Sequence, residues 1–423
     1  MKKNQTLIII GNGMAANRVL EELGTDHPFS EVHILSDEAI AHYNRIMLSP
    51  LLAKETTLAD ITPHDADWYL QHRTTIHLST PVTAVDRVKK IVFSNDIQFS
   101  YDALIIATGS RSFIPPVTGS DAENVIGFRT MSDVDAMESR LHSMQHVTVI
   151  GAGLLGVEAA TGLQSRGVKT TLIHRNTVLM NRQLDGAAAD ILYAELNHRG
   201  VDVRTATSPV ELIKENNQVH KIIIEADSHQ QTLHTDLIVF ATGITPNKEP
   251  GELAGIDCNR GVVVNAHMTT SDPYIFALGE CCEYEKNTYG LVAPIWDQAR
   301  VLAKKLTLRF TSDKALHDEL EKQPYRERTH LTKLKVSGLD MHSIGRFDID
   351  EEDTEAGIEI LRMSDIEMGI YKKLVLQNNR IIGVVCVGDV VDSFWYHELM
   401  EAATDVTPLR TNLLLGKAYA ESA

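Results

Sequence analysis

One stretch of this chain, residues 147–162, has the residue types and spacing that hold a phosphate. A β-branched run at 147–150 leads into three glycines spaced GxGxxG, and an apolar, alanine-rich segment follows. The first glycine permits a tight turn, the second lets a pyrophosphate approach the backbone, and the third lets a helix pack closely on the strand. Unpaired N–H groups at the start of the helix hold the phosphates. The spacing predicts a dinucleotide site formed by Gly151, Gly153, Leu154, Leu155 and Gly156.

The N-terminus repeats this design. The apolar run Thr6–Ile10 predicts a buried parallel strand, and Gly11 and Gly13 follow it with Ala16 in the third small position. One such motif alone is weak evidence, whereas two of them predict that one chain holds two nucleotides. We assign the first site to Gly11, Gly13, Met14, Ala15 and Ala16.

A carboxylate at the end of the second strand of such a unit accepts hydrogen bonds from a ribose. In the first unit the predicted strand Glu31–Leu35 ends shortly before Asp37 and Glu38. We assign the ribose to Asp37, with Glu38 as the alternative. Without the glycines, the same residues would be interpreted as a solvated acidic turn.

The second unit lacks this carboxylate. Its predicted strand Lys169–Ile173 ends in His174 and Arg175. An arginine here can pair with a 2′-phosphate, which favours NADPH or the use of both nucleotides. A solvent-facing arginine is the other interpretation, and the sequence leaves both open.

Two further segments repeat each other: 102–109 reads DALIIATG and is followed by Ser110, and 236–243 reads DLIVFATG. Strands are also predicted at Ile76–Val85, Lys90–Phe93, Gly261–Val264 and Tyr274–Leu278, and helices at Asp133–His142 and Val292–Lys305. Two glycine motifs and two ATG strands indicate a duplicated nucleotide-binding architecture with one domain inserted into the other.

The character of the chain changes after about residue 322, where short strands of a mostly antiparallel sheet are predicted and helices follow from Tyr396. The predicted fold class is α/β, with two Rossmann-like domains and a C-terminal α+β domain. We expect an FAD-binding domain at 1–115 and 245–321, an NAD(P)H-binding domain at 116–244 and an interface domain at 322–423. The acidic run Asp348–Glu355 is interpreted as a solvated loop, or as a site that docks a basic electron acceptor.

Composition limits the partners. The chain has 423 residues, a formal net charge of −17 and 43% hydrophobic residues, which argues against nucleic acid or an anionic membrane surface. The apolar run at 7–10 is too short for a signal peptide, and the glycines of 147–163 argue against a membrane span. We therefore expect a cytoplasmic protein without a membrane anchor.

The four cysteines have no metal-ligand spacing and are expected to be reduced thiols. Cys281 and Cys282 are adjacent, so they form either a vicinal redox pair or two small buried residues beside a cofactor. No metal site is predicted from the histidines.

Together these motifs resemble the pyridine-nucleotide-disulfide reductase superfamily of two-nucleotide flavoproteins, across essentially the whole chain. The landmarks are the two glycine motifs, the two ATG strands and the stretch Ile275–Glu280. The resemblance implies FAD in the first site and NADH or NADPH in the second. It also implies FAD contacts for Arg45, Val82, Thr108, Gly109, Arg129, Gly279, Glu280, Pro294 and Trp296. The NAD(P) site would then include Glu158, His174, Arg175 and Gly243.

Members of this superfamily that use thiols carry cysteines near the first helix or in the loop corresponding to Tyr43–Leu52. This chain has no cysteine before Cys258. The resemblance therefore implies that reduced flavin passes electrons directly to an external acceptor. No side chain is assigned a catalytic role, and Glu158 and Arg45 are the candidates for groups near the flavin.

Four segments give a finer resemblance: Tyr43–Ala53, Tyr289–Ala303, Thr332–Gly345 and Val387–Met400. They are similar to the flavin module of NAD(P)H-dependent nitrite reductases and, more closely, to electron-transfer subunits of assimilatory nitrate reductases. The chain ends without a ferredoxin-like cysteine module or a sirohaem domain, so we expect that it does not reduce nitrite itself. Pro50 after Ser49 departs from the lysine usual in oxygenase-linked ferredoxin reductases.

The function predicted from these features is an FAD-dependent NAD(P)H:acceptor oxidoreductase. Its expected acceptor is a redox protein, either the catalytic subunit of a nitrate or nitrite reductase, or rubredoxin or a ferredoxin-like carrier. A redox-sensing flavoprotein with little turnover and a thiol reductase that uses Cys281 and Cys282 are the alternatives. The expected assembly is a monomer or a homodimer.

Overall fold

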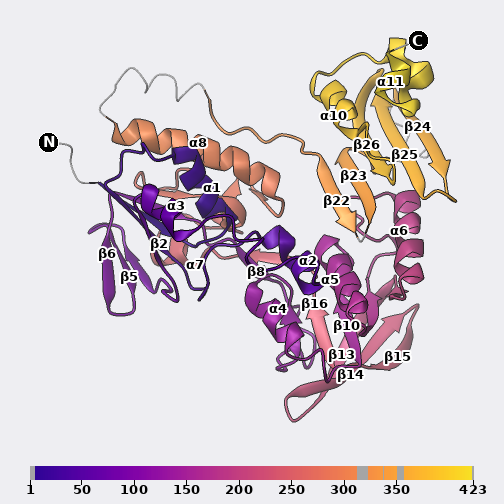
Figure 1. The fold of residues 1–423 in the computed structure, drawn as a ribbon, viewed down its shortest axis with the longest axis horizontal. Helices are drawn as coiled ribbons and strands as arrows, with labels where there is room; N and C mark the ends of the chain where they lie inside the picture. The colour runs from indigo at the N-terminus through magenta and orange to yellow at the C-terminus, as the bar shows by residue number, and fades with distance from the viewer. Residues whose placement is uncertain (1–4, 312–322, 337, 350–356, 422–423) are drawn as a thin grey trace. The chain divides into compact units, whose positions relative to one another are not determined.

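The computed structural model describes residues 5–311, 323–336, 338–349 and 357–421 (Figure 1). The chain forms two compact units, of which unit 1 comprises residues 1–111 and 244–328 and unit 2 comprises residues 112–243 and 329–423. The C-terminal segment thus groups with the second nucleotide-binding segment, and its division into a third domain stays a prediction. Most of the acidic run Asp348–Glu355 lies outside the described residues.

A parallel five-stranded sheet forms the centre of unit 1, in the order β19-β7-β1-β2-β3. The strands β1 and β7 lie inside this sheet and are almost wholly buried, which is why their sequences are continuous apolar runs. Helices α1 and α8 pack against each other beside the sheet. The five strands and two helices are β1 (Thr6–Ile10), β2 (Glu31–Leu35), β3 (Thr74–His77), β7 (Ala103–Ile106), β19 (Ile275–Ala277), α1 (Met14–Leu23) and α8 (Val292–Phe310).

The remaining elements of unit 1 are short. They comprise the antiparallel sheet β4-β5-β6, the small sheet β18-β20-β21, the pair β8 and β17, and several helical turns. Their bounds are β4 (Ala84–Asp86), β5 (Ile91–Ser94), β6 (Ile97–Ser100), β8 (Ser110–Ser112), β17 (Ile244–Pro246), β18 (Val262–Val263), β20 (Cys282–Tyr284), β21 (Asn287–Thr288), η1 (Arg45–Met47), α2 (Leu48–Leu52), α3 (Ala66–Gln71), α7 (Glu249–Leu253) and η2 (Gly279–Cys281).

Unit 2 contains a second parallel sheet, in the order β12-β11-β10-β16-β9, and an antiparallel sheet, β13-β14-β15. The strand β10 pairs with β11 and β16 as β1 pairs with β2 and β7, so the predicted duplication is confirmed. The elements are β9 (Val125–Gly127), α4 (Met131–Glu138), β10 (His146–Ile150), α5 (Leu154–Ser165), β11 (Lys169–Ile173), α6 (Gly186–His198), β12 (Asp202–Arg204), β13 (Thr207–Glu215), β14 (Gln218–Ala226), β15 (His229–His234) and β16 (Leu237–Phe240).

The C-terminal part of unit 2 is an antiparallel sheet in the order β22-β23-β26-β25-β24, as predicted. Helices α10, η4 and α11 follow it, and their apolar side chains share a core with the sheet. The elements are β22 (Thr332–Val336), β23 (Leu339–Gly345), β24 (Ile358–Asp365), β25 (Ile370–Gln377), β26 (Arg380–Val387), α10 (Ser393–Glu401), η4 (Thr407–Leu415) and α11 (Lys417–Ala420).

Some predicted elements differ from those in the structure. Ile76–Val85 is not one strand, because the chain leaves the sheet after His77 and β4 begins at Ala84 in another sheet. The helix predicted at Asp133–His142 starts at Met131, since Thr130 and Asp133 form a capping box there, and it ends at Glu138. The strand predicted at Gly261–Val264 is present in unit 1 but shorter, because β18 spans only Val262–Val263.

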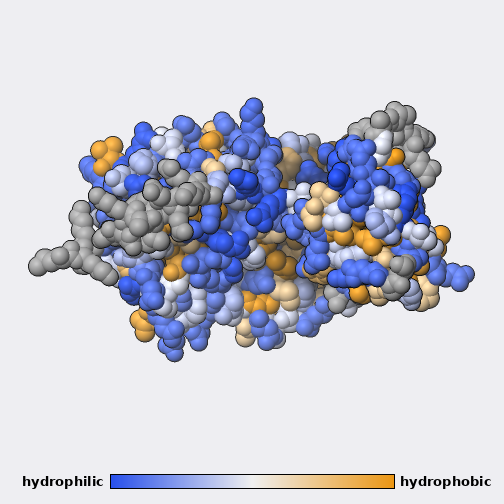
Figure 2. Space-filling model, turned by 90° about the horizontal axis from the view of Figure 1, so that it is seen from above, coloured by the Kyte–Doolittle hydropathy of each residue, from blue (hydrophilic) through white to orange (hydrophobic). Residues whose placement is uncertain are grey.

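The surface in Figure 2 is mainly hydrophilic, with apolar residues in small groups. Within the described ranges, no helix is both long and apolar enough to cross a membrane.

Asn124 connects three segments of unit 2 through its buried amide group. Its Nδ2 donates to the carbonyl oxygens of Val219 and Asp236, both at 2.8 Å, and its Oδ1 accepts from the Val219 N–H at 2.7 Å. We expect Asn124→Ala to lower the free energy of unfolding by about 3 kcal/mol, because buried backbone groups lose their partners. Gln218→Ala is the control, because Gln218 bonds an exposed side-chain carboxylate. Urea unfolding measures both, and equal effects would contradict the assignment.

Candidate functional site

The first phosphate turn lies between β1 and α1. Gly11 has a φ of +102°, and a Cβ there would overlap the carbonyl oxygen of Ala107 at the end of the neighbouring strand. Gly13 is the N-cap of α1, and no side chain among the described residues caps this helix. Side chains do cap α3, α4 and α6. The N–H groups of the first turn of α1 are therefore available to an anion.

An asparagine adds a donor at this turn. The buried Nδ2 of Asn12 has no hydrogen-bond partner among the described residues, while its Oδ1 accepts from Nδ2 of Asn17 at 3.0 Å. Met14, Ala15 and Ala16 form the first turn of α1, and Ala16 is fully buried. Both the unpaired donor and the glycine turn fit a pyrophosphate, so the residues present suit a dinucleotide.

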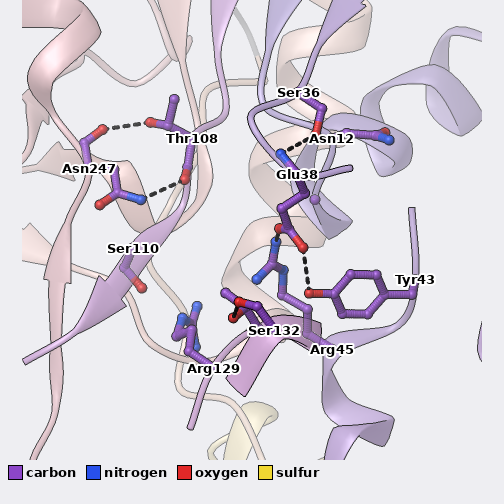
Figure 3. Close-up of polar contacts among 12 residues, drawn as sticks. Asn12, Ser36, Glu38, Tyr43, Arg45, Thr108, Ser110, Arg129, Ser132 and Asn247 are labelled. Carbon is purple, nitrogen blue, oxygen red and sulfur yellow. Dashed lines mark hydrogen bonds and ion pairs between the residues drawn. The ribbon is translucent and has the colours of Figure 1, made fainter. Parts of the chain in front are cut away.

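The end of β2 carries a polar cluster that Figure 3 shows. The Glu38 carboxylate accepts from the Tyr43 hydroxyl at 2.8 Å and forms an ion pair with Arg45. Nε of Arg45 lies 3.9 Å from the position of a Cβ on Gly13, so its side chain lies beside the phosphate turn. Asp37, the residue assigned to the ribose, is exposed at the same end of β2. That assignment stays a prediction, and the structure adds a second role for Glu38 in holding Arg45.

The segment before Val82, a predicted FAD contact, is attached to this end of β2. The N–H of Thr80 donates to the carbonyl oxygen of Ser36, and that of Ser79 donates to Glu38. These bonds hold the segment that leads to Val82, which is half-buried against the core of unit 1. Its contact with FAD stays a prediction.

The ATG segment after β7 is fixed by a distant asparagine. Thr108 Oγ1 donates to the carbonyl oxygen of Asn247 at 2.6 Å, and Nδ2 of Asn247 donates to that of Thr108 at 3.0 Å (Figure 3). The N–H of Asn247 donates to Gly109, whose φ is +65°. The second chain segment of unit 1, which begins at Ile244, thus lies directly against Thr108 and Gly109.

Gly279 and Glu280 follow β19, the last strand of the same sheet. The N–H of Gly279 donates to the buried Gln298 in α8 at 2.9 Å, and Glu280 accepts from Ser110 at 2.7 Å. Pro294 and Trp296 lie in the first turns of α8, and Arg18 of α1 lies 5.4 Å from the Trp296 ring centroid. Within unit 1, the predicted FAD residues that follow β1, β2, β7 and β19 therefore lie at the carboxyl ends of strands of one parallel sheet.

Arg129 belongs to unit 2, where its N–H donates to the Asp133 carboxylate just before α4. Its predicted contact with the flavin stays a prediction.

The second phosphate turn has the same geometry as the first. Gly151 has a φ of +106°, and a Cβ there would lie 2.5 Å from the Ala241 carbonyl oxygen. Gly156 has no room for a Cβ beside the carbonyl oxygen of Gly151. Gly153 is the N-cap of α5 without a capping side chain among the described residues, and Leu154 and Leu155 begin the helix. Gly243, with a φ of +124°, follows the neighbouring strand β16.

His174 and Arg175 occupy the end of β11. Nδ1 of His174 accepts the N–H of Ala152 at 3.2 Å, so the ring lies at the phosphate turn. Burial lowers the pKa of His174, which keeps the ring neutral and able to accept this bond. The Arg175 side chain is exposed and Glu158 is half-buried in α5. Because this guanidinium is exposed, the structure is compatible with both interpretations of Arg175, as a partner of a 2′-phosphate and as a solvent-facing side chain.

Several contributors to these sites are absent from the sequence-based assignment. They are the side-chain amides of Asn12, Asn17, Asn247 and Gln298. Of these, only Asn12 could be found from sequence, because it lies inside the glycine motif. His42 is also buried near the turn, where burial lowers its pKa to about 4.

The adjacent cysteines are enclosed. Cys281 and Cys282 are fully buried, and each thiol donates to a backbone carbonyl oxygen at 3.2 Å. Burial raises the pKa of both thiols, so they stay protonated at neutral pH. The four cysteines all belong to the described residues and form no disulfide. Across the described ranges there is no group of three His, Cys, Asp or Glu side chains that could hold a metal ion.

Comparison with known proteins matches two family models. Residues 5–299 match pyridine nucleotide-disulphide oxidoreductases, and residues 331–404 match the rubredoxin NAD+ reductase C-terminal domain. A Bacillus subtilis protein named nitrite reductase, NAD(P)H, is 36% identical over 96% of this chain and 48% of its own length. The assimilatory nitrate reductase electron transfer subunit of B. subtilis is 36% identical over 92% of this chain and 48% of its own length. This chain therefore spans about half the length of these relatives.

Among solved structures, the NADH:rubredoxin oxidoreductase of Clostridium acetobutylicum superposes with a TM-score of 0.75 at 21% identity. The match covers 98% of this chain and 100% of that one. This likeness supports the fold.

Gly153→Ala tests the second phosphate turn without disturbing the protein. A Cβ at Gly153 meets no protein atom within 4 Å and the residue has a negative φ, so the variant should fold normally. We expect dinucleotide affinity to fall about tenfold or more, because the methyl group occupies the place of the pyrophosphate. Gly186→Ala is the control, since Gly186 also has open space around it and lies at the start of α6. Calorimetric titration with NAD+ and NADP+ measures both, and unchanged affinity in Gly153→Ala would place the ligand elsewhere.

Proposed function

The chain belongs to the pyridine nucleotide-disulphide oxidoreductase family, and we propose from this premise that it is an FAD-dependent NAD(P)H:acceptor oxidoreductase. The observation that carries the proposal is the pair of matching phosphate turns, one in each unit, with no room for a Cβ at Gly11 or Gly151. The turn of unit 1 holds FAD and that of unit 2 holds NADH or NADPH.

FAD supplies the redox chemistry, since a bound flavin takes up a hydride and returns electrons to an acceptor. The chain's own residues bind and orient the two nucleotides. Asn12 and the first turn of α1 hold the pyrophosphate, and the Glu38–Arg45 pair supports them from the end of β2. No described side chain has to act as acid or base for a hydride transfer. Glu158 and Arg45 remain the proposed groups near the flavin.

The acceptor is a redox protein in this proposal. Cys281 and Cys282 are buried and protonated, so they offer no thiol relay between a bound flavin and an acceptor. The similarity to the electron transfer subunit of B. subtilis supports the catalytic subunit of an assimilatory nitrate or nitrite reductase as that acceptor. The match of residues 331–404 to the rubredoxin NAD+ reductase C-terminal domain supports rubredoxin or a ferredoxin-like carrier as the second candidate. A cytoplasmic location and a monomeric or homodimeric assembly belong to the same proposal.

Anaerobic stopped-flow spectroscopy tests this function. We expect the purified protein to be yellow, to lose its flavin absorbance on mixing with NADH or NADPH, and to recover it on mixing with a competent acceptor. A nitrate reductase subunit, a rubredoxin and ferricyanide are the acceptors to compare. Reduction without re-oxidation by any of them would favour a redox sensor. A colourless protein that takes up no FAD would contradict the proposal.

Arg175→Gln tests the choice of nicotinamide nucleotide. If the guanidinium pairs with the 2′-phosphate, its removal should lower kcat/KM for NADPH about tenfold and leave that for NADH unchanged. Lys169→Gln is the control, because it removes the same charge at the opposite end of β11. Steady-state assays with both nucleotides give the ratio. A ratio that does not change would assign Arg175 to solvent.

A further inference from the structure

One carboxylate in unit 2 joins the nucleotide-binding region to the C-terminal sheet. Oδ1 of Asp185 accepts the N–H of Ala188 at 3.1 Å and so caps α6. Oδ2 of the same carboxylate accepts the Tyr371 hydroxyl at 2.7 Å and lies 3.1 Å from Nζ of Lys373. Tyr371 and Lys373 belong to β25, and the Lys373 side chain is fully buried. One carboxylate oxygen of Asp185 therefore caps α6, and the other binds side chains of the C-terminal sheet.

The segment before Asp185 lies against the phosphate turn. The N–H of Met180 donates to the carbonyl oxygen of Ala152, the residue between the two turn glycines, at 2.9 Å. Met180 has a φ of +49°, which a bulky residue rarely adopts, and it is buried. The N–H of Leu184 then donates back to Met180. The phosphate turn is therefore connected to Asp185 through the short segment 180–184.

We propose that Asp185, held by Tyr371 and Lys373, is a positioning residue for the nicotinamide dinucleotide. The C-terminal sheet fixes the segment 180–185 against Ala152 and so keeps the phosphate turn in its binding geometry. Without this attachment the segment must be ordered when the nucleotide binds, and that ordering lowers the affinity. The inference rests on the proposed function, because it takes the turn of unit 2 to be the NAD(P)H site.

The neighbouring lysine supplies a matched control. Lys372 is almost as buried as Lys373 and precedes it in the same strand, so its side chain points to the opposite face of the sheet. Its Nζ lies 2.7 Å from Oδ2 of Asp389 and 3.7 Å from Oδ2 of Asp392, at the start of α10. Removing Lys372 disturbs the C-terminal sheet without touching Asp185.

The experiment compares the FAD-loaded variants Lys373→Met, Tyr371→Phe and Lys372→Met with the unchanged chain. Calorimetric titration with NAD+ and with NADP+ gives the dissociation constants, and flavin absorbance gives the FAD content. We expect Lys373→Met to weaken nucleotide binding about fivefold or more, Tyr371→Phe to weaken it about twofold, and Lys372→Met to leave it unchanged. In assays with ferricyanide, Lys373→Met should raise KM for the nucleotide and preserve kcat.

The outcomes separate the inference from the proposed function. Equal weakening in Lys373→Met and Lys372→Met would mean a general loss of stability and would overturn the inference, as would unchanged affinity in Lys373→Met. If Lys373→Met does not fold, Tyr371→Phe decides, because it removes one hydrogen bond and keeps the ion pair. Failure of the unchanged chain to bind either nucleotide would instead refute the proposed function.

Discussion

The absence of space at two glycine turns is the constraint on which the rest of the structure depends. At Gly11 and at Gly151 the turn passes so close to a neighbouring strand that any side chain would strike a carbonyl oxygen, and both residues have positive φ. This contact fixes the direction in which α1 and α5 leave their sheets, with their first N–H groups uncapped by side chains of the described residues. The anion-binding geometry thus follows from backbone packing rather than from charged side chains.

Much of this arrangement could be predicted from sequence because it rests on local patterns. The bounds of β1, β2 and β11 follow from apolar runs that end at a glycine or a polar turn, and the structure confirms them. The sheet β13-β14-β15 was missed, since its strands are half-exposed and β15 is mostly polar, which leaves no clear period. The break after His77 was missed because apolar residues continue on both sides of a segment that leaves the sheet.

The parts of the site that sequence could not reveal depend on residues far apart in the chain. Asn247 pairs with Thr108, Gln298 with Gly279, and Glu280 with Ser110, and no spacing rule connects such positions. Side-chain amides have no characteristic motif, although a buried amide that bonds two backbone groups determines where a loop lies. The choice between Asp37 and Glu38 was open for a similar reason. Only the fold brings Tyr43 and Arg45 to the Glu38 carboxylate and leaves Asp37 exposed.

The two consecutive lysines of β25 show how a charge pattern can mislead when the partners are distant. In sequence, Lys372 and Lys373 would indicate a solvated strand, yet both are buried. Because successive residues of a strand point to opposite faces, each lysine needs its own acid, and these come from Asp389 and Asp185, which lie on different elements. Breaking a buried pair leaves an uncompensated charge, at a cost of about 3–5 kcal/mol. The strand can therefore occupy this place only while the segment between β26 and α10 supplies Asp389 and the segment before α6 supplies Asp185.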